Sequence, residues 1–97
     1  MIPKPRQLEN CNSWSRTFPE SWKSAYFRRV VKNPEIGYEC PMCHKCFRGL
    51  KGYKQLHADH IRPYSSFSRY SDNLGPTTWE NLQLLCSQCN LKKYDFH

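Results

Sequence analysis

The sequence predicts a small α+β domain with two short antiparallel strands and a terminal helix, preceded by an N-terminal arm and a longer helix. Two Cys-x-x-Cys pairs, Cys40/Cys43 and Cys86/Cys89, flank a strand-like segment, 56–63, that ends in a proline. An apolar segment just before the second pair predicts the partner strand. With 97 residues the chain forms one domain, and a core this small is only marginally stable by itself. We therefore expect the cysteines to reinforce it.

The first third of the chain predicts an extended arm and then an amphipathic helix. Residues 1–16 hold two prolines and show no periodicity, whereas Thr17-Phe18-Pro19-Glu20 resembles a capping box at the start of a helix over 19–32. Asn33-Pro34 ends that helix. Its apolar side chains form one stripe, which we expect to pack in the core: Trp22, Tyr26, Phe27, Val30 and Val31.

The cysteine spacing favours tetrahedral zinc coordination by thiolates over a disulfide framework. Cys46 offers Cys43/Cys46 as a competing pair, and His44 is an alternative ligand. We favour Cys40/Cys43, because a Cys-Pro-x-Cys turn with an aromatic residue two positions ahead is typical of a zinc knuckle. Cys46 is then expected to be a small buried residue, and the glycine-containing segment 48–54 a flexible basic loop.

The net charge is +7, from 15 Lys and Arg against 8 Asp and Glu, which favours a polyanionic partner. The sequence has no apolar run long enough to span a bilayer, no lipid-anchor motif, and a proline-broken start that does not resemble a signal peptide. We therefore expect no membrane partner and synthesis in a reducing, intracellular compartment.

Asp59 and His60 stand next to each other in the first predicted strand, where adjacent side chains point to opposite faces. One can hold a metal ion while the other handles a proton. The long connection 64–77 is unusual in a compact domain and is therefore expected to be functional. Residues 79–85 predict the second strand, antiparallel to the first, and a basic helix then runs from Cys86 through Tyr94.

Taken together, these motifs resemble the HNH family of nucleases, whose core is the ββα-metal finger. The matching elements are Cys-x-x-Cys, Asp-His-Ile-x-Pro, and Glu-Asn-Leu-Gln-x-Leu-Cys-x-x-Cys-Asn-x-x-Lys, in that order. The resemblance runs from Tyr38 to Lys93. We therefore expect residues 1–37 to form an arm and basic helix, and residues 38–97 to form the nuclease core of a single compact domain.

The resemblance implies a metal-dependent DNA endonuclease that leaves 5′-phosphate and 3′-hydroxyl ends. His60 would be the general base, Asn81 would brace the loop and the histidine, and Asp59 and Asn90 would hold a catalytic cation. Asn90 occupies the last position of the motif, where the final H of the name HNH stands for a histidine. Two oxygen ligands favour Mg²⁺ or Mn²⁺, whereas a Cys₄ zinc site has no open position and would be structural.

Double-stranded DNA is the expected substrate, although the residues leave RNA open. The basic residues that flank the centre are expected to contact phosphates: Arg62, Arg69, Lys92 and Lys93. One site cuts one strand, so double-strand cleavage would need two chains or two cleavage events. A homodimer therefore fits, with the arm and first helix as its expected contact. An inhibitor protein is expected if the chain is a toxin domain. The expected location is the cytoplasm, in a bacterial or phage-like setting, or the target cell if the chain is a toxin domain. Restriction, phage and toxin roles are all open at this point.

A non-catalytic zinc-ribbon module that binds nucleic acid is the alternative. Such ribbons share the two cysteine pairs and the basic charge, but they do not need an Asp-His pair between them. Their cysteine pairs also lie closer together in sequence.

Overall fold

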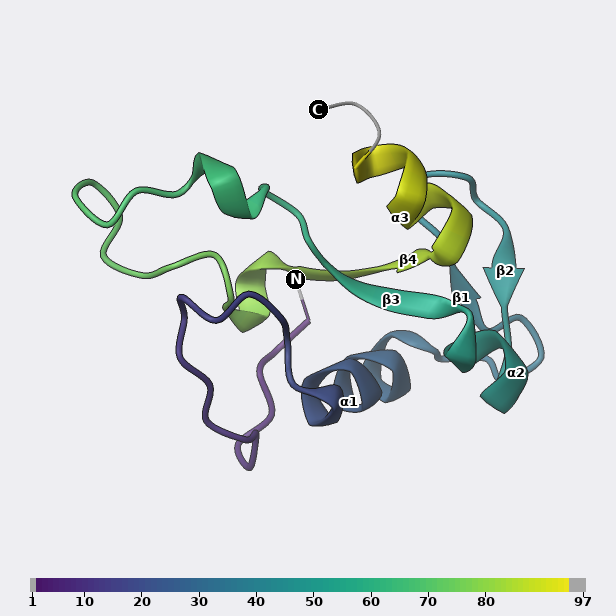
Figure 1. The fold of residues 1–97 in the computed structure, drawn as a ribbon. Helices are drawn as coiled ribbons and strands as arrows, with labels where there is room; N and C mark the ends of the chain where they lie inside the picture. The colour runs from purple at the N-terminus through teal and green to yellow at the C-terminus, as the bar shows by residue number, and fades with distance from the viewer. Residues whose placement is uncertain (1, 95–97) are drawn as a thin grey trace.

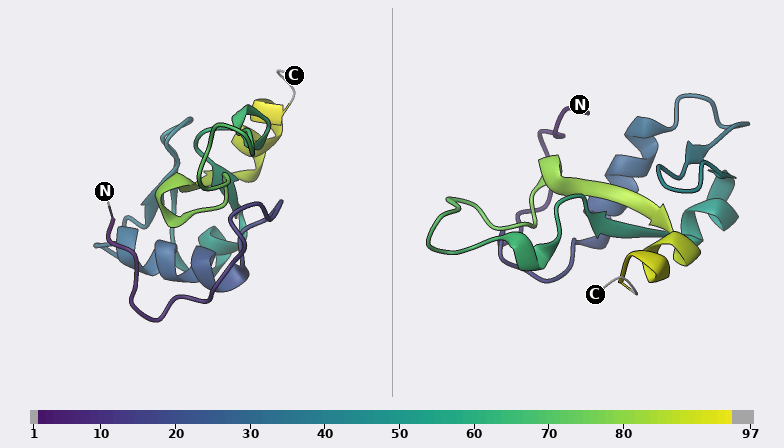
Figure 2. Two further views of the ribbon diagram at one scale, coloured as in Figure 1. Left: turned by 90° about the vertical axis from the view of Figure 1, so that its left-hand side faces the viewer. Right: turned by 90° about the horizontal axis from the view of Figure 1, so that it is seen from above.

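The computed structural model describes residues 2–94, so the last three residues of the predicted 38–97 core lie outside the described part. The architecture confirms the α+β class. Its elements follow in this order: α1 (Glu20–Val30), β1 (Tyr38–Glu39), β2 (Cys46–Phe47), α2 (Gly49–Lys54), β3 (Leu56–His60), β4 (Leu82–Cys86) and α3 (Ser87–Tyr94). Figure 1 shows α1 and α3 on opposite sides of the β3–β4 hairpin, and Figure 2 agrees. Among the described residues, no helix is long and apolar enough to cross a membrane.

The β3–β4 pair is the antiparallel hairpin that the sequence predicts. Its register sets Leu56 opposite Cys86 and His60 opposite Leu82. The second strand starts later than expected, because Trp79–Asn81 forms a 3₁₀ turn that leads into it. The hairpin therefore places the Asp-His pair at the end of β3 that meets the long loop, and Cys86 at the opposite end.

The apolar stripe of α1 packs on the hairpin core as predicted. Trp22 is buried, and its ring meets that of Trp79 edge-on with centroids 6.4 Å apart. Tyr26 meets the same ring with centroids 5.6 Å apart. Aromatic pairs in this geometry contribute about 0.5–1.5 kcal/mol beyond the area they bury. Helix α1 is thus joined to the turn that starts β4.

The predicted capping box at the start of α1 is wrong. Pro19 is the N-cap residue, and no side chain caps the helix. Proline fixes its own φ near the helical value, and its carbonyl accepts the first helical hydrogen bond, from Trp22 N at 3.0 Å. The Glu20 carboxylate instead accepts a hydrogen bond from the Tyr53 hydroxyl at 2.6 Å, which links α1 to α2.

The segment that the sequence predicted as a flexible basic loop forms α2. Gly49 begins this helix with a φ of 65°. Gly52 is buried, and a Cβ at that position would lie 2.6 Å from the Phe47 carbonyl carbon. Gly52 thus lets a short helix pack closely against β2, whereas Gly49 supplies the positive φ at its start, so neither glycine makes this segment a flexible loop.

The N-terminal arm, over residues 2–19, forms no helix or strand, turns at residues 6–7 and 13–14, and packs against the rest of the chain. The Trp22 indole N–H donates to the Glu9 carbonyl at 2.6 Å, and the Trp79 indole N–H donates to the Ile2 carbonyl at 2.9 Å. Farther along, Thr77 N donates to the Ser13 carbonyl at 2.8 Å. The arm is therefore held beside the loop that joins β3 to β4.

Candidate active site

Four cysteines converge at the end of the hairpin away from the long loop. Cys40 and Cys43 follow β1, Cys86 ends β4, and Cys89 lies in the first turn of α3. Their Sγ atoms all lie within 4.8 Å of one another, and Cys43 Sγ is 3.7 Å from Cys86 Sγ. A tetrahedral zinc site with Zn–S bonds of about 2.3 Å has sulfur–sulfur separations of roughly 3.8 Å. The cluster can therefore hold a metal ion such as zinc.

The thiols of this cluster differ in acidity. Burial alone would raise the pKa of Cys40, but hydrogen bonds from the backbone N–H groups of Cys43, Cys86 and Met42 lower it to about 6. Burial, together with the neighbouring thiols, raises the pKa of Cys89 to about 12. The Cys40 thiolate is thus stabilised by backbone amides, whereas the raised pKa of Cys89 disfavours a second negative charge at the cluster. A shared cation would relieve that opposition.

The two alternative zinc ligands lie outside the cluster. Cys46 is exposed on β2, so the expectation of a small buried residue there is wrong. His44 has a φ of 64° and directs Nδ1 toward Glu39 Oε2 at 3.3 Å. The structure therefore brings together the four cysteines of the two Cys-x-x-Cys pairs and leaves the competing residues out.

Asp59 is the centre of a second polar cluster, built from β3, β4 and α3. This residue is 2% exposed. Its Oδ2 accepts hydrogen bonds from Lys93 Nζ at 2.6 Å and from Gln83 Nε2 at 2.8 Å, while Oδ1 faces Asn90 Nδ2 at 3.5 Å. A half-turn of the Asn90 amide would present its oxygen to Oδ1 instead. The structure thus brings Asp59 and Asn90 together, and Oδ1 has a single long contact with Asn90 where Oδ2 accepts two short hydrogen bonds.

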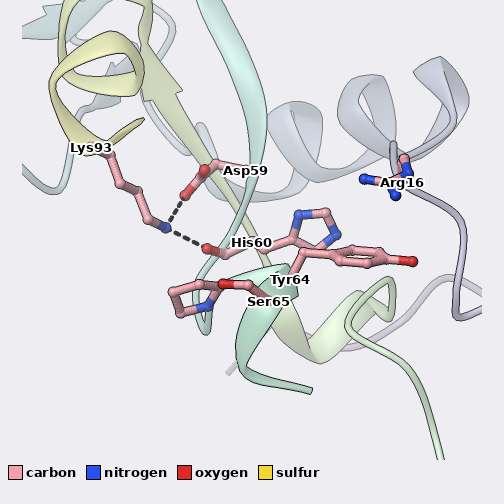
Figure 3. Close-up of a pocket in the computed structure, with 7 residues that line it drawn as sticks. Arg16, Asp59, His60, Tyr64, Ser65 and Lys93 are labelled. Atoms are coloured by element: carbon pink, nitrogen blue, oxygen red, sulfur yellow. Dashed lines mark hydrogen bonds and ion pairs between the residues drawn. The ribbon is translucent and has the colours of Figure 1, made fainter. Parts of the chain in front are cut away.

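Lys93 was expected to contact a phosphate, and in the structure its side chain is bonded within the protein. Its ammonium bonds both to Asp59 and to the His60 carbonyl oxygen (Figure 3). Its side chain is 22% exposed. The lysine therefore balances the charge of a buried carboxylate, which would otherwise be costly to bury. Lys92, its neighbour, is exposed.

His60 is buried beside Asp59, with 6% of its surface exposed. Its ring packs against Phe18 with centroids 4.5 Å apart, and its Nε2 lies 2.9 Å from Thr77 Oγ1. The Thr77 hydroxyl donates its single proton to the Ser15 carbonyl. It can therefore only accept from His60, so Nε2 carries the ring proton and Nδ1 keeps a free lone pair.

The electrostatics of His60 favour its neutral form. Burial lowers its pKa below the usual 6.5, and the positive charge of Lys93 lowers it further, while the Asp59 carboxylate acts in the opposite direction. The net shift is downward. The imidazole is therefore uncharged at neutral pH, with a nitrogen available to take up a proton.

Asn81 joins the two ends of the long loop. Its Oδ1 accepts from Arg62 N at 2.8 Å, and its Nδ2 donates to the carbonyls of Arg62, at 3.1 Å, and Pro76, at 2.8 Å. Its own carbonyl accepts from Ile61 N at 2.9 Å. Asn81 therefore fixes the backbone just after His60 and just before Thr77.

The two arginines of the loop contact other parts of the loop and arm. The Arg62 guanidinium donates to the Ser66 carbonyl at 2.8 Å and lies 4.0 Å from the Phe67 ring centroid. The Arg69 guanidinium carbon lies 4.5 Å from the Trp14 ring centroid. Both residues are exposed on the loop between β3 and β4.

A cavity of about 400 Å³ opens over the Asp59 and His60 side chains. Figure 3 shows the residues that line it: Arg16, Asp59, His60, Pro63, Tyr64, Ser65 and Lys93. Arg16 and Lys93 are cationic, and His60 can become so. The single carboxylate, Asp59, is already paired with Lys93. The cavity therefore suits an anionic group.

Three residues of the site were missed by sequence reasoning. Gln83 follows Asn81 by two positions in the predicted strand, and the register places it opposite Asp59, so alternation along that strand could have indicated it. Thr77 and Arg16 carry no such signal. Their roles depend on how the arm folds over the loop, which no local pattern predicts.

Comparison with known protein families finds a match to the HNH endonuclease model over residues 40–96, which is more than half of the chain. No curated protein and no solved structure matches. The match covers both cysteine pairs, the Asp-His pair and Asn90, and it confirms the resemblance drawn from the motifs. It indicates a nuclease or nucleic-acid-binding function. The chain belongs to the HNH endonuclease family.

Proposed function

We propose that the protein is a metal-dependent endonuclease that hydrolyses phosphodiester bonds in double-stranded DNA. The observation that carries this proposal is the state of His60. It is buried and neutral, its Nε2–H is engaged by Thr77, and its free Nδ1 belongs to a ring that lines a basic cavity beside Asp59. A binding module has no need of a histidine prepared in this way.

In this proposal His60 is the general base. Its Nδ1 accepts a proton from the attacking water, and Nε2 stays protonated by its bond to Thr77. The imidazolium formed in that step lies beside the Asp59 carboxylate, which stabilises the new charge. By resemblance to the family, the products carry 5′-phosphate and 3′-hydroxyl ends. Asn81 holds the backbone on both sides of this arrangement and so braces the histidine.

Asp59 and Asn90 would hold the catalytic cation. Gln83 and Lys93 occupy Oδ2 of the carboxylate, which leaves Oδ1 facing the Asn90 amide. Both side chains offer oxygen, the donor that Mg²⁺ and Mn²⁺ prefer. Such a cation, when bound, would polarise the scissile phosphate and stabilise the leaving 3′ oxygen.

The four-cysteine cluster would hold one structural zinc ion per chain. It lies at the joint between β4 and α3, the helix that carries Asn90 and Lys93. Zinc bound there would set the position of α3 against β3, and with it the second cation ligand. Free thiols persist in reducing compartments, so we further propose a cytoplasmic site of action, in the producing cell or in a target cell.

The basic surface would bind the DNA backbone. Arg62 and Arg69 are exposed on the loop between β3 and β4, and Lys92 is exposed on α3. The chain has a net charge of +7. Lys93 would reach a phosphate only by loosening its bond to Asp59. One site cuts one strand, so double-strand cleavage would involve a homodimer or two events. An inhibitor protein would accompany a toxin role.

Nicking of supercoiled plasmid tests the proposal. The purified protein is incubated with Mg²⁺ or Mn²⁺, alongside His60→Ala and Asp59→Ala variants, with zinc content and DNA binding measured on each. We expect metal-dependent nicking by the wild type and none by either variant, with zinc retained. Binding of zinc and DNA without cleavage under any divalent metal would instead favour the zinc-ribbon module.

A further inference from the structure

The N-terminal arm contributes a cationic side chain to the active-site cavity. Arg16 lines this cavity together with Asp59, His60 and Lys93. In Figure 3 its side chain lies across the His60 ring from Asp59 and Lys93. Arg16 lies outside residues 40–96, the part of the chain that matches the family. It is therefore an addition to the site made by this chain's own arm.

The backbone just before Arg16 is hydrogen-bonded to both ends of the long loop between β3 and β4. The Tyr64 hydroxyl donates to the Trp14 carbonyl at 2.6 Å, and the Thr77 hydroxyl donates to the Ser15 carbonyl. A Cβ on Gly75 would lie 2.2 Å from the Ser13 carbonyl oxygen, so the arm and loop approach as closely as a glycine permits. The start of the Arg16 side chain is therefore positioned before any ligand binds.

The Arg16 guanidinium is available to a ligand. Its Cζ lies 5.5 Å from the Tyr64 ring centroid, which supports the group from one side. The residue is exposed, and none of the ion pairs formed among residues 2–94 includes it. The carboxylate in the cavity, Asp59, is already paired with Lys93. An anion entering the cavity would thus meet an arginine that has no competing partner there.

We propose that Arg16 binds the non-bridging oxygens of the substrate phosphate that sits beside His60. A guanidinium presents a planar fork of N–H donors that matches a phosphate in a bidentate manner. Arg16 then contacts the phosphate from the side of the cavity opposite Lys93. This inference rests on the proposed function, because it takes the ligand to be a phosphodiester. It makes the arm part of the substrate site.

Duplex binding measured without turnover tests this role. Each Arg16 variant is made in a His60→Ala background, and its affinity for a labelled DNA duplex is measured over a range of salt concentrations. Arg29→Ala is the matched control, since it removes an equal charge from the exposed face of α1. Zinc content and circular dichroism confirm that each variant is folded. Arg16→Gln joins Arg16→Ala so that packing against Tyr64 is partly kept.

We expect Arg16→Ala and Arg16→Gln to weaken binding by about tenfold, as for a lost charge-assisted hydrogen bond. They should also lower the slope of log affinity against log salt by about one phosphate contact. In the same His60→Ala background, Arg16→Lys should restore most of the affinity and the salt slope. With His60 intact, Arg16→Lys should cleave more slowly than the wild type, because lysine cannot form the bidentate contact.

Affinity and salt slope equal to those of Arg29→Ala, for both the alanine and glutamine variants, would overturn the proposal. Absence of cleavage by the wild type would count against the endonuclease proposal alone. The role of Arg16 would still be decided by the binding comparison, because binding is measured in a variant that does not turn over.

Discussion

The hydrogen bond between Thr77 and His60 gives a sharp test of the proposed chemistry. Replacing Thr77 by valine keeps the shape of the side chain but removes its hydroxyl. His60 Nε2–H then loses its acceptor, and the Ser15 carbonyl loses its donor. Since Thr77 is 1% exposed, water has little access to replace either bond. The ring proton of His60 is then no longer held on Nε2.

The size of the effect follows from the energy of one buried hydrogen bond. Losing about 1–2 kcal/mol of preference for the productive tautomer lowers the cleavage rate by roughly 5- to 30-fold. Stability should fall as well, by about 1–3 kcal/mol, because two polar groups are left without partners. Thr77→Ser keeps the hydroxyl, so it should retain most of the activity.

The assay is single-turnover cleavage of a labelled duplex in Mg²⁺, with stability from urea unfolding. Thr78→Val is the matched control, because it removes a hydroxyl from the neighbouring, half-buried residue. Cleavage by Thr77→Val at the rate of this control would refute the assignment of the ring proton. So would a Thr77→Ser variant as slow as Thr77→Val.

The pH dependence of the wild type follows from the lowered pKa of His60. Activity should rise with pH as the base loses its proton, and level off below the usual histidine value of 6.5. Between the folded and unfolded pKa values, the unfolded chain binds more protons at His60 than the folded chain does. The free energy of unfolding therefore has its full contribution from His60 above pH 6.5 and loses it as the pH falls toward the folded pKa. Cleavage rates and urea midpoints between pH 5 and 8 would show both trends.

Three further substitutions, together with Cys46→Ser as a control, test the supports of the fold and the site. Cys86→Ser should lose bound zinc and unfold the domain, since metal binding contributes to the folding of small domains. The control Cys46→Ser should keep both its zinc and its fold, as measured by metal analysis and circular dichroism. Asp59→Asn should destabilise the fold by roughly 3 kcal/mol in urea unfolding, because it leaves the Lys93 ammonium without its partner; an unchanged midpoint would contradict this. Gly52→Ala should cost about 1–3 kcal/mol, measured in the same way, because its Cβ would meet the β2 backbone; a gain in stability would show that α2 can shift.

The sequence predicted the parts of the fold that local patterns determine. The alternation around Asp59 and before Cys86 indicated the hairpin, and the Cys-x-x-Cys spacing indicated which thiols would meet. Asn81 and Asn90 came from their place in the motif, and the structure sets Asn90 beside Asp59. The roles of these residues stay predictions, although their proximity is now described.

The features that the sequence could not predict depend on contacts between distant segments. Gly52 suggested flexibility until Phe47 proved to lie against it, and Pro19 displaced the predicted capping residue. Thr77 and Arg16 gain their places from the arm folding over the loop, where each contact joins residues far apart in the chain. No periodicity encodes such contacts, because they follow from the packing of the whole domain.

Chemical rescue of His60→Ala by imidazole tests the central claim most directly. In single-turnover cleavage with Mg²⁺, the variant should be inactive while it keeps its zinc and its affinity for DNA. Added imidazole should restore part of the rate, with a pH dependence that follows the neutral form of imidazole, and should leave the wild type unchanged. Cleavage by His60→Ala at the wild-type rate without imidazole would contradict the account.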